Sequence, residues 1–324
     1  MAVLITGGAG YIGSHCNKYF AKMGIETIIL DSLLYGHKEA VVSGELIVGD
    51  LGNKELLNSI FCKNNIEAVV HFAALADVAD SVARPCKYYD VNVSKMITLL
   101  DAMVENNVKH IIFSSSAATF GEPKFIPIDE KHKQEPVNPY GMTKLIGEKI
   151  LKDYENAYGI NYCILRYFNA SGADPEGEIG ESHNPEHHIL PLLFKTALGK
   201  RDVFYIFGND YDTKDGTCLR DYVHVRDLAS AHFLALQYLR EGNGSSDFNL
   251  GNNVGYTVMD IINKFQEIAN IDLNYKMADR REGDPAKLVA SNEKSKRLLG
   301  WTPEFSDIEV IIRDAWNWEM HKKY

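Results

Sequence analysis

The sequence predicts an α/β protein with a doubly wound parallel sheet and a smaller α/β substrate-binding domain beside it. In the first half, short β-branched runs such as "AVLIT" and "ETIIL" alternate with amphipathic segments. A glycine-rich turn follows the first run directly, as expected where a parallel strand leads into a helix. Beyond about residue 172 the alternation gives way to stretches rich in Gly, Asp, Glu and Pro, which are typical of functional loops.

The same alternation predicts the elements in chain order. Strands are expected at 2–6, 26–30, 45–49, 67–74, 109–116, 161–171 and 246–252. Helices are expected at 14–24, 53–65, 91–107, 140–159 and 225–239. We therefore expect residues 1–172, with returning segments from about 218–250, to form the larger domain, and residues 173–217 with 251–324 to form the smaller one.

Composition narrows the class of protein. A chain of 324 residues with 45% hydrophobic content can bury one large core or two joined ones. No apolar run approaches the roughly 20 residues that span a bilayer, and the N-terminus runs straight into a strand pattern, so we expect neither a membrane span nor a signal peptide. Five scattered cysteines without C-x-x-C spacing suggest neither disulfides nor a thiolate metal site and favour the cytoplasm. The formal net charge of -10 argues against nucleic-acid binding.

The turn after the first strand, "TGGAGYIGSH", carries Gly7, Gly10 and Gly13. Glycines let the backbone approach a pyrophosphate, and a helix that begins here offers unpaired N–H groups and the positive end of its dipole. Asp31 ends the second strand, where a carboxylate can accept hydrogen bonds from an adenosine ribose and repel the 2′-phosphate of NADP. The pattern therefore predicts a Rossmann-type site for NAD. Asp50, after the third strand, is a candidate for the adenine side or a simple strand-end cap.

A second group of residues, around "NPYGMTK", predicts reactive chemistry. Residues 138–139 have the N-cap and first-turn proline typical of a helix start, and Gly159 is a typical stop. Tyr140 and Lys144 then share one helical face. A tyrosine base near pH 7 needs its pKa lowered by roughly three units, which an ammonium can help to supply. Ser116 in "FSSSAATFG" would complete a relay, because parallel-sheet enzymes place their chemistry at the carboxyl ends of strands.

Together these motifs resemble the short-chain dehydrogenase/reductase superfamily in its extended, nucleotide-sugar-modifying branch. "HFAALADVADSV", "YYDVNV", "LRYFNASGADP", "IFGNDYDTKDGTCLRDYVHVRDL", "FNLGN" and "RREGDPAKLVAS" run in the order seen in the UDP-hexose 4-epimerases of that branch, over essentially the whole chain. The resemblance implies tightly held NAD, a UDP-hexose such as UDP-glucose or UDP-galactose as substrate, and inversion at C4 through a transient 4-keto sugar. It also implies a homodimer packed through the helix carrying Tyr140 and the long helix before it.

The resemblance assigns roles to individual residues. Tyr140 is implied to be the general base, Lys144 to bind the nicotinamide ribose and lower the tyrosine pKa, and Ser116 to be the catalytic hydroxyl. The implied cofactor-binding residues are Gly7, Gly10, Tyr11, Ile12, Gly13, Asp31, Ser32, Asp50, Leu51, Phe72, Ala73, Ala74, Leu75, Asn92, Ser114, Tyr140, Lys144 and Tyr167. The implied substrate-binding residues are Ser116, Asn169, His188, Ile189, Tyr205, Phe207, Arg220, Arg281, Asp284 and Leu288.

Three positions depart from the family pattern. Ala76 stands where some members carry a lysine that contacts the cofactor. Phe120 replaces a tyrosine whose hydroxyl could touch the substrate. Leu288 occupies the position thought to gate the C2 substituent of the sugar; it is smaller than tyrosine and larger than cysteine, so acceptance of N-acetylated sugars is left open.

The segment "HNPEHHIL" raises the question of a metal. His183 and His187 have a spacing that zinc sites use, but no cysteine or further histidine nearby completes a fourfold shell, so no metal is expected. The resemblance instead implies that His188 and Ile189 lie in a loop over the nucleotide.

Two other functions compete with epimerisation. A sugar-nucleotide 4,6-dehydratase shares the glycine turn and the Tyr-Lys pair, but it needs an extra acid and base after the strand-five serine, where this chain has Ala117 and Ala118. Epimerases of UDP-uronates or UDP-pentoses remain open as related activities. A binding module that senses NAD without turnover tends to lose the tyrosine or the lysine, and this chain keeps both.

Overall fold

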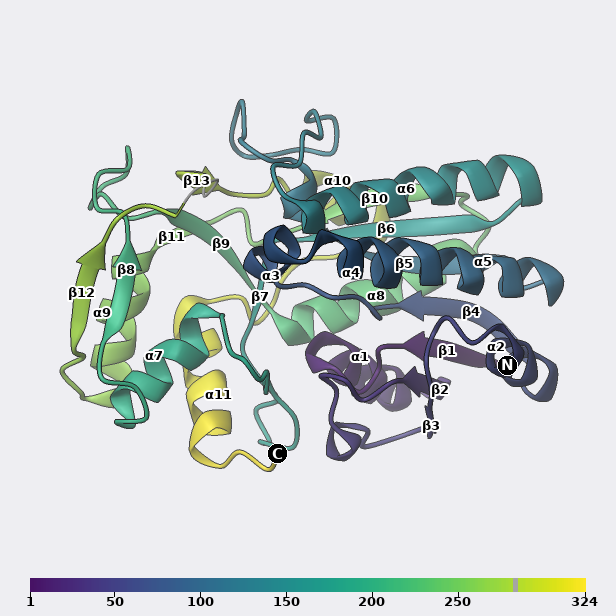
Figure 1. Ribbon diagram of the computed structural model, residues 1–324, viewed down its shortest axis with the longest axis horizontal. Helices are drawn as coiled ribbons and strands as arrows, with labels where there is room; N and C mark the ends of the chain where they lie inside the picture. The colour runs from purple at the N-terminus through teal and green to yellow at the C-terminus, as the bar shows by residue number, and fades with distance from the viewer. Residues whose placement is uncertain (282–284) are drawn as a thin grey trace.

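The computed structural model describes residues 1–281 and 285–324 and shows two joined parts (Figure 1). The larger part is a sheet with helices on both faces, on the right in Figure 1, and the smaller part on the left contains β8, β12, α7, α9 and α11. The predicted fold class, a Rossmann-type doubly wound parallel sheet with a smaller α/β part, is confirmed.

Seven parallel strands form the large sheet in the order β10-β6-β5-β4-β1-β2-β3. This order contains the 3-2-1-4-5-6 arrangement of dinucleotide-binding sheets, with one further strand at the edge. The strands are β1 (Ala2–Thr6), β2 (Glu26–Asp31), β3 (Glu45–Val48), β4 (Ile66–His71), β5 (His110–Ser116), β6 (Asn161–Tyr167) and β10 (Ser246–Leu250).

Helices cover both faces of this sheet because β-branched and leucine side chains alternate to either side of each strand. One core includes Leu4 and Ile111 and is closed by α2, α5 and α6, while the other includes Val3 and Ile112 and is closed by α1, α8 and α10. The helices are α1 (Tyr11–Lys22), α2 (Lys54–Lys63), α5 (Lys95–Glu105), α6 (Pro139–Tyr158), α8 (Val225–Arg240) and α10 (Glu293–Leu299), and α3 (Val78–Ala83) and α4 (Pro85–Tyr89) lie beside α6.

The smaller part is assembled from segments far apart in the sequence. β9 (Leu219–His224) pairs with β7 (Asn169–Ser171), β11 (Gly255–Thr257) and β13 (Lys287–Leu288), and β8 (Phe204–Phe207) pairs with β12 (Tyr275–Ala278). Its apolar core includes Phe194, Ile206, Phe265 and Ile312. Three helices supply most of that core: α7 (Ile189–Ala197), α9 (Val258–Ala269) and α11 (Ile308–Met320).

Two expected elements differ from the structure. The helix expected at 91–107 starts with a wider π-helical turn at Asp90–Ser94 before α5 begins, and Asn92 within that turn bonds to neighbouring segments. The strand expected at 161–171 is two strands, because β6 belongs to the large sheet and β7 pairs with β9 in the smaller part. Short 3-10 turns occur at Lys38–Ala40 and Ala117–Thr119.

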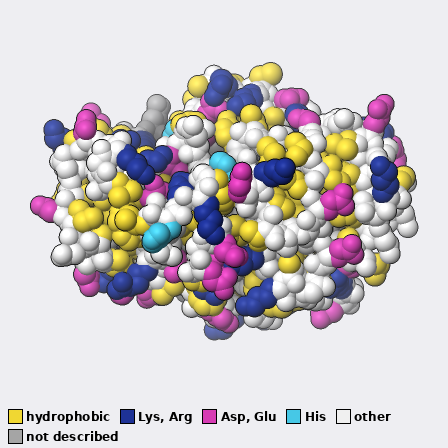
Figure 2. Space-filling view, turned by 90° about the horizontal axis from the view of Figure 1, so that it is seen from below, with side chains coloured by type: hydrophobic (Ala, Val, Ile, Leu, Met, Phe, Trp, Pro, Cys, Tyr) yellow, Lys and Arg dark blue, Asp and Glu magenta, His cyan; other side chains and the backbone are white. Residues whose placement is uncertain are grey.

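The surface carries charges of both signs. Figure 2 shows one face, on which acidic and basic side chains are interspersed with hydrophobic ones, so the net charge of -10 is not gathered into a single field on that face. Among the described residues no helix has both the length and the apolar character needed to cross a bilayer.

Candidate active site

The glycine turn between β1 and α1 is packed too closely to admit side chains. Gly7 has a φ of 75°, and a Cβ there would lie 2.6 Å from the Ala73 nitrogen. A Cβ at Gly13 would lie 2.2 Å from the Gly7 carbonyl oxygen. Gly10 is the N-cap of α1 and makes no side-chain cap, so the first N–H groups of the helix face the turn without a side-chain acceptor. This backbone cradle fits a pyrophosphate.

Asp31 joins the end of β2 to the cradle. Its side chain is buried, and its two oxygens accept hydrogen bonds from the Ala9 N–H at 2.9 Å and the Leu33 N–H at 2.8 Å. A carboxylate has about four lone-pair positions, so acceptor capacity is left for ribose hydroxyls. The chain's residues therefore fit NAD: an acid stands at the ribose position, and the cradle has no room for a Cβ.

The cradle gives a first prediction. Gly13→Ala should weaken NAD binding at least about tenfold, because a backbone shift that relieves the overpacking costs about 1–3 kcal/mol and moves the N–H groups away from the pyrophosphate. Fluorescence titration with NADH measures the affinity, and thermal unfolding of the same sample reports the fold. Unchanged affinity in a folded variant would contradict the cradle.

The reactive residues lie at the carboxyl end of β5 and the start of α6. The Asn138 side chain accepts a hydrogen bond from the Gly141 N–H at 2.8 Å, which caps α6 and places Tyr140 in its first turn, as predicted. Ser116 ends β5 and is hydrogen-bonded to Tyr140. Burial raises the pKa of Tyr140, and the hydrogen bond with Ser116 acts in the opposite direction. The expected proximity of tyrosine and serine is present.

Lys144 lies one turn further along α6 and is buried. Its Nζ donates to the Ser114 carbonyl oxygen at 2.7 Å and lies 5.9 Å from the centre of the Tyr140 ring. Burial lowers the pKa of Lys144 to about 7, opposed by the negative charge of Glu148. The ammonium is thus held at a fixed place beside the tyrosine, with a protonation state sensitive to what binds there.

Sequence reasoning did not predict the buried polar network that lies next to Lys144 and Ser116. Glu148 Oε1 accepts from the Ser115 hydroxyl at 2.5 Å and from Nε of Arg166 at 2.9 Å. All three side chains are buried. The spacing Y-x-x-x-K-x-x-x-E on one helix face is a signal that could have found Glu148. Because the network fixes β5 against α6, we assign it a positioning role for Ser116 and Lys144.

Three other predicted cofactor residues, Asn92, Tyr167 and Asp50, have side chains that contact other residues of the chain. Asn92 uses both amide hydrogens within the chain, on the Leu75 carbonyl and the Thr143 hydroxyl, so it positions the loop after β4. The Tyr167 hydroxyl is buried against Nε2 of His232 at 2.6 Å. Asp50 pairs with Nζ of Lys95 at 2.6 Å. Two of the remaining predicted positions, Tyr11 and Ile12, begin α1. The others lie within β5 or up to three residues after the ends of β2, β3 and β4: Ser114, Ser32, Leu51, Phe72 and Ala74.

Most of the predicted substrate residues lie on elements of the smaller part. Asn169 lies on β7, and its Nδ2 donates to the Asp221 carbonyl at 3.1 Å. Arg220 on β9 is buried and pairs in register with Leu288 on β13. The Arg281 guanidinium lies 3.9 Å from the centre of the Phe207 ring, a cation–π contact. The exposed Tyr205 also lies on β8. His188 is the N-cap of α7 and Ile189 its first residue, and Asp284 falls outside the described residues.

Two of the three positions that depart from the family pattern, Phe120 and Leu288, lie close together in the structure. Phe120 is fully buried and packs with Ala117 and Ile128 in a small cluster just after β5. Leu288 packs against the same cluster. Leu288 therefore lies next to the turn that follows Ser116, which is where a gate on the sugar would act.

The segment before α7 holds an unexpected cluster. Glu181, His183, Glu186 and His188, called here the 181–188 cluster, place one ligand atom each within 4.8 Å of one another. His187, which sequence reasoning paired with His183, instead contacts Asp77 at 2.8 Å. Carboxylates, rather than a further histidine or cysteine, complete the group.

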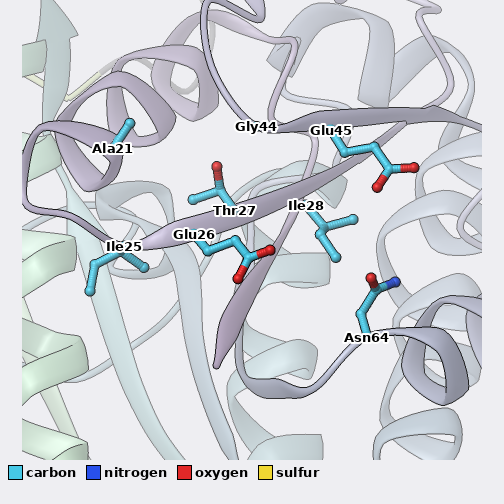
Figure 3. Close-up of a pocket in the computed structure, with 8 residues that line it drawn as sticks. All are labelled: Ala21, Ile25, Glu26, Thr27, Ile28, Gly44, Glu45 and Asn64. Atoms are coloured by element: carbon cyan, nitrogen blue, oxygen red, sulfur yellow. The ribbon is translucent and has the colours of Figure 1, made fainter.

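A separate cavity is lined by none of the predicted site residues. It has a volume of about 250 Å³ and lies between α1, β2 and β3 (Figure 3). Glu26 and Glu45, which line it, are the first residues of β2 and β3. It is thus at the amino ends of these strands, whereas Ser116 is at the carboxyl end of β5.

A dinucleotide cradle and a Tyr-Lys-Ser group at the same edge of a parallel sheet define a nicotinamide-dependent enzyme of the short-chain dehydrogenase/reductase type. The chain belongs to the NAD dependent epimerase/dehydratase family, whose sequence profile matches residues 3–251.

Individual relatives agree with this assignment. A UDP-glucose 4-epimerase from Halalkalibacterium halodurans is 48% identical over 324 residues, covering 100% of this chain and 96% of the relative. The crystal structure of UDP-glucose 4-epimerase from Brucella ovis in complex with NAD is 44% identical, with a TM-score of 0.96 and 98% of each chain covered. The enzyme from Bifidobacterium longum in complex with NAD+ and UDP is 35% identical, with a TM-score of 0.94 and 99% of each chain covered.

Proposed function

We propose that Tyr140, Ser116 and Lys144 are the catalytic residues of a UDP-hexose 4-epimerase, an NAD-dependent isomerase acting on UDP-glucose and UDP-galactose. The observation that carries the proposal is the hydrogen-bonded Tyr140 and Ser116 beside a buried ammonium, at the edge of the sheet that holds the cradle. The full-length similarity to UDP-glucose 4-epimerases supports the substrate.

The residues divide the chemistry between them. Tyr140 removes the proton of the sugar 4-hydroxyl, and Ser116 hydrogen-bonds the same oxygen as it becomes a carbonyl. Lys144 favours the tyrosinate electrostatically. The glycine cradle and Asp31 would hold NAD, which would supply the hydride acceptor for C4 and the hydride donor for the opposite face of the sugar. Tyr140 then gives the proton back, so atoms and charge balance with no net oxidation.

The residues of the smaller part are proposed to hold the nucleotide sugar. Arg220 and Arg281 suit the diphosphate because guanidinium groups bind phosphate oxygens bidentately. Asn169 on β7 and His188, the N-cap of α7, are proposed as further contacts to the nucleotide sugar. We keep the proposed division, in which residues 1–172 and about 218–250 bind the cofactor and residues 173–217 and 251–324, Asp284 included, bind the substrate. Asn169 and Arg220 are exceptions, because β7 and β9 carry them into the smaller part.

A direct assay tests the function. Purified protein with its bound NAD is incubated with UDP-galactose, without added NAD, and UDP-glucose is followed by chromatography. We expect interconversion to an equilibrium mixture. A folded, NAD-loaded protein that converts neither UDP-galactose nor a UDP-N-acetylhexosamine would refute the assignment and favour a NAD-sensing protein.

A second activity, on UDP-N-acetylhexosamines, is favoured by Leu288, which is smaller than the tyrosine that would close this position. We expect turnover of UDP-N-acetylgalactosamine by the wild type, and a loss of about tenfold or more in Leu288→Tyr while UDP-galactose turnover changes less than about threefold, because a filled pocket excludes the larger C2 substituent. Coupled assays with both sugars measure this ratio.

The control is Leu298→Tyr, the same substitution at an exposed position on α10, which should change neither rate. Equal losses on both sugars in Leu288→Tyr would show that Leu288 supports the fold rather than gating the sugar. UDP-uronates and UDP-pentoses in the same assay test the remaining epimerase alternatives.

We further propose a cytoplasmic homodimer that binds no nucleic acid. Exposed apolar side chains on three neighbouring helices support a partner surface: Val78 and Val82 on α3, Tyr89 on α4 and Ile97 on α5. A second copy packed through α5 and α6 would cover them. Light scattering that gives a mass near that of one chain would refute the dimer.

A further inference from the structure

We propose that the 181–188 cluster is a binding site for one divalent cation of the zinc class, with Glu181, His183, Glu186 and His188 as ligands. The cluster lies outside the tyrosine site, on the segment that leads into α7. The four side chains come from eight consecutive residues, and all offer atoms that zinc binds, imidazole nitrogen and carboxylate oxygen.

The distances fit a single small shell. Nδ1 of His188 lies 2.7 Å from Glu181 Oε1, and the four side chains can each place one ligand atom within 4.8 Å of the others. Nδ1 of His183 lies 3.2 Å from Glu181 Oε1 and 3.9 Å from Glu186 Oε2. Ligand atoms of a tetrahedral zinc shell with bonds of about 2.1 Å are about 3.4 Å apart, so small side-chain adjustments place an ion at the centre.

One of the proposed ligand atoms, Glu186 Oε2, is buried and has no hydrogen-bond partner among the described residues. The Glu186 side chain is 1% exposed. The other oxygen, Oε1, accepts from the backbone N–H groups of His187 and His188 at 2.8 and 2.9 Å, which fixes the carboxylate with Oε2 directed toward His183. A buried carboxylate oxygen without a partner is costly, and a cation removes that cost.

The chemistry of the ligands selects the class of ion. Two carboxylates and two neutral imidazoles around a divalent cation give a site with no net charge. Calcium and magnesium prefer all-oxygen shells, whereas imidazole nitrogens favour zinc and its neighbours in the first transition series. The histidines form the exposed side of the cluster and the carboxylates its buried side, which gives an ion a path of entry.

The surroundings indicate what the ion does. The His183 ring meets the Tyr11 ring edge-on at 6.4 Å between centres, and Tyr11 is the first residue of α1 in the cofactor cradle. The Glu181 carbonyl accepts from the Trp318 indole of α11 at 2.9 Å. His188 is the N-cap of α7. A bound ion would therefore fasten the segment before α7 between the cradle and the smaller part.

Metal content is the first test. The full chain with bound NAD is stripped with EDTA, equilibrated with ZnCl2, desalted, and analysed by inductively coupled plasma mass spectrometry. We expect about one zinc per chain for the wild type, and less than about a tenth of that for His183→Ala and for Glu181→Gln, because each loses one of four ligands. His187→Ala is the matched control; it changes a histidine of the same segment that faces Asp77, and it should keep its zinc.

Thermal unfolding is the second test. Zinc should raise the melting temperature of the wild type and of His187→Ala by a few degrees and leave His183→Ala unchanged. If both ligand variants fail to fold, visible absorption of the Co2+-loaded wild type decides, since a four-coordinate site absorbs far more strongly than an octahedral one. A wild type that retains no zinc, equal retention in folded His183→Ala, or loss in His187→Ala would overturn the proposal.

Discussion

Replacing Tyr140 by phenylalanine should lower the turnover of UDP-galactose by about 10³-fold while the protein keeps its NAD. The substitution leaves the ring in place at the start of α6 and removes only the hydroxyl that is hydrogen-bonded to Ser116. A positioned general base contributes about 10²- to 10⁴-fold, and here one group both takes the proton and returns it. The measurements are the initial rate of UDP-glucose formation and the nucleotide released on denaturation.

The control for this prediction lies on the same helix. Tyr158, in the last turn of α6, is 49% exposed, so Tyr158→Phe removes the same hydroxyl far from Ser116 and should leave the rate unchanged. Turnover of Tyr140→Phe within about tenfold of the wild type, with NAD still bound, lies below the usual range for a general base and would assign proton transfer to another group.

The sequence was informative about this region because its signals are local. The cap by Asn138, the proline at position 139 and the left-handed Gly159, with a φ of 67°, all act within one helix and were predicted from residue type. The cradle is equally local, since Gly7 and Gly13 are needed by backbone contacts within one turn. Strand and helix order then follow from apolar periodicity.

The smaller part could not be predicted in the same way. β7, β9 and β13 are short, and their pairing joins residues near 169, 220 and 288, so the contact between Arg220 and Leu288 has no local signature. The 181–188 cluster has no regular period either. Which histidine joins the cluster, His188 rather than His187, depends on a neighbouring carboxylate and on Asp77, and spacing rules detect neither.

Lys144→Met should also lower turnover strongly, and it should change the pH profile. Without the ammonium, 5.9 Å from the Tyr140 ring centre, only the hydrogen bond with Ser116 opposes the burial that raises the pKa of Tyr140. The active tyrosinate then becomes rarer at pH 7, and the rate should rise about tenfold per pH unit up to about pH 9. The wild type should show a shallower rise. The measurement is kcat for UDP-galactose from pH 6 to 9.5, and a parallel profile for variant and wild type would contradict the role of Lys144.

The stability of the nucleotide-free protein provides an independent check on the same lysine. Burial lowers the folded-state pKa of Lys144 to about 7, below the ordinary value of 10.5. Between these values the unfolded chain binds more protons than the folded one, so the contribution of Lys144 to stability is lowest below pH 7 and grows as pH rises through this window, by up to about 1.4 kcal/mol per pH unit.

Urea unfolding from pH 6.5 to 9.5 measures this slope. The wild type should gain stability relative to Lys144→Met as pH rises, and Lys149→Met, which removes an exposed lysine from the same helix, should follow the wild type. If the difference between wild type and Lys144→Met does not depend on pH, then Lys144 is not buried as a strained ammonium. A lysine with an ordinary pKa is a solvated ammonium that stays charged at neutral pH, so solvent would screen its charge and weaken its effect on the pKa of Tyr140.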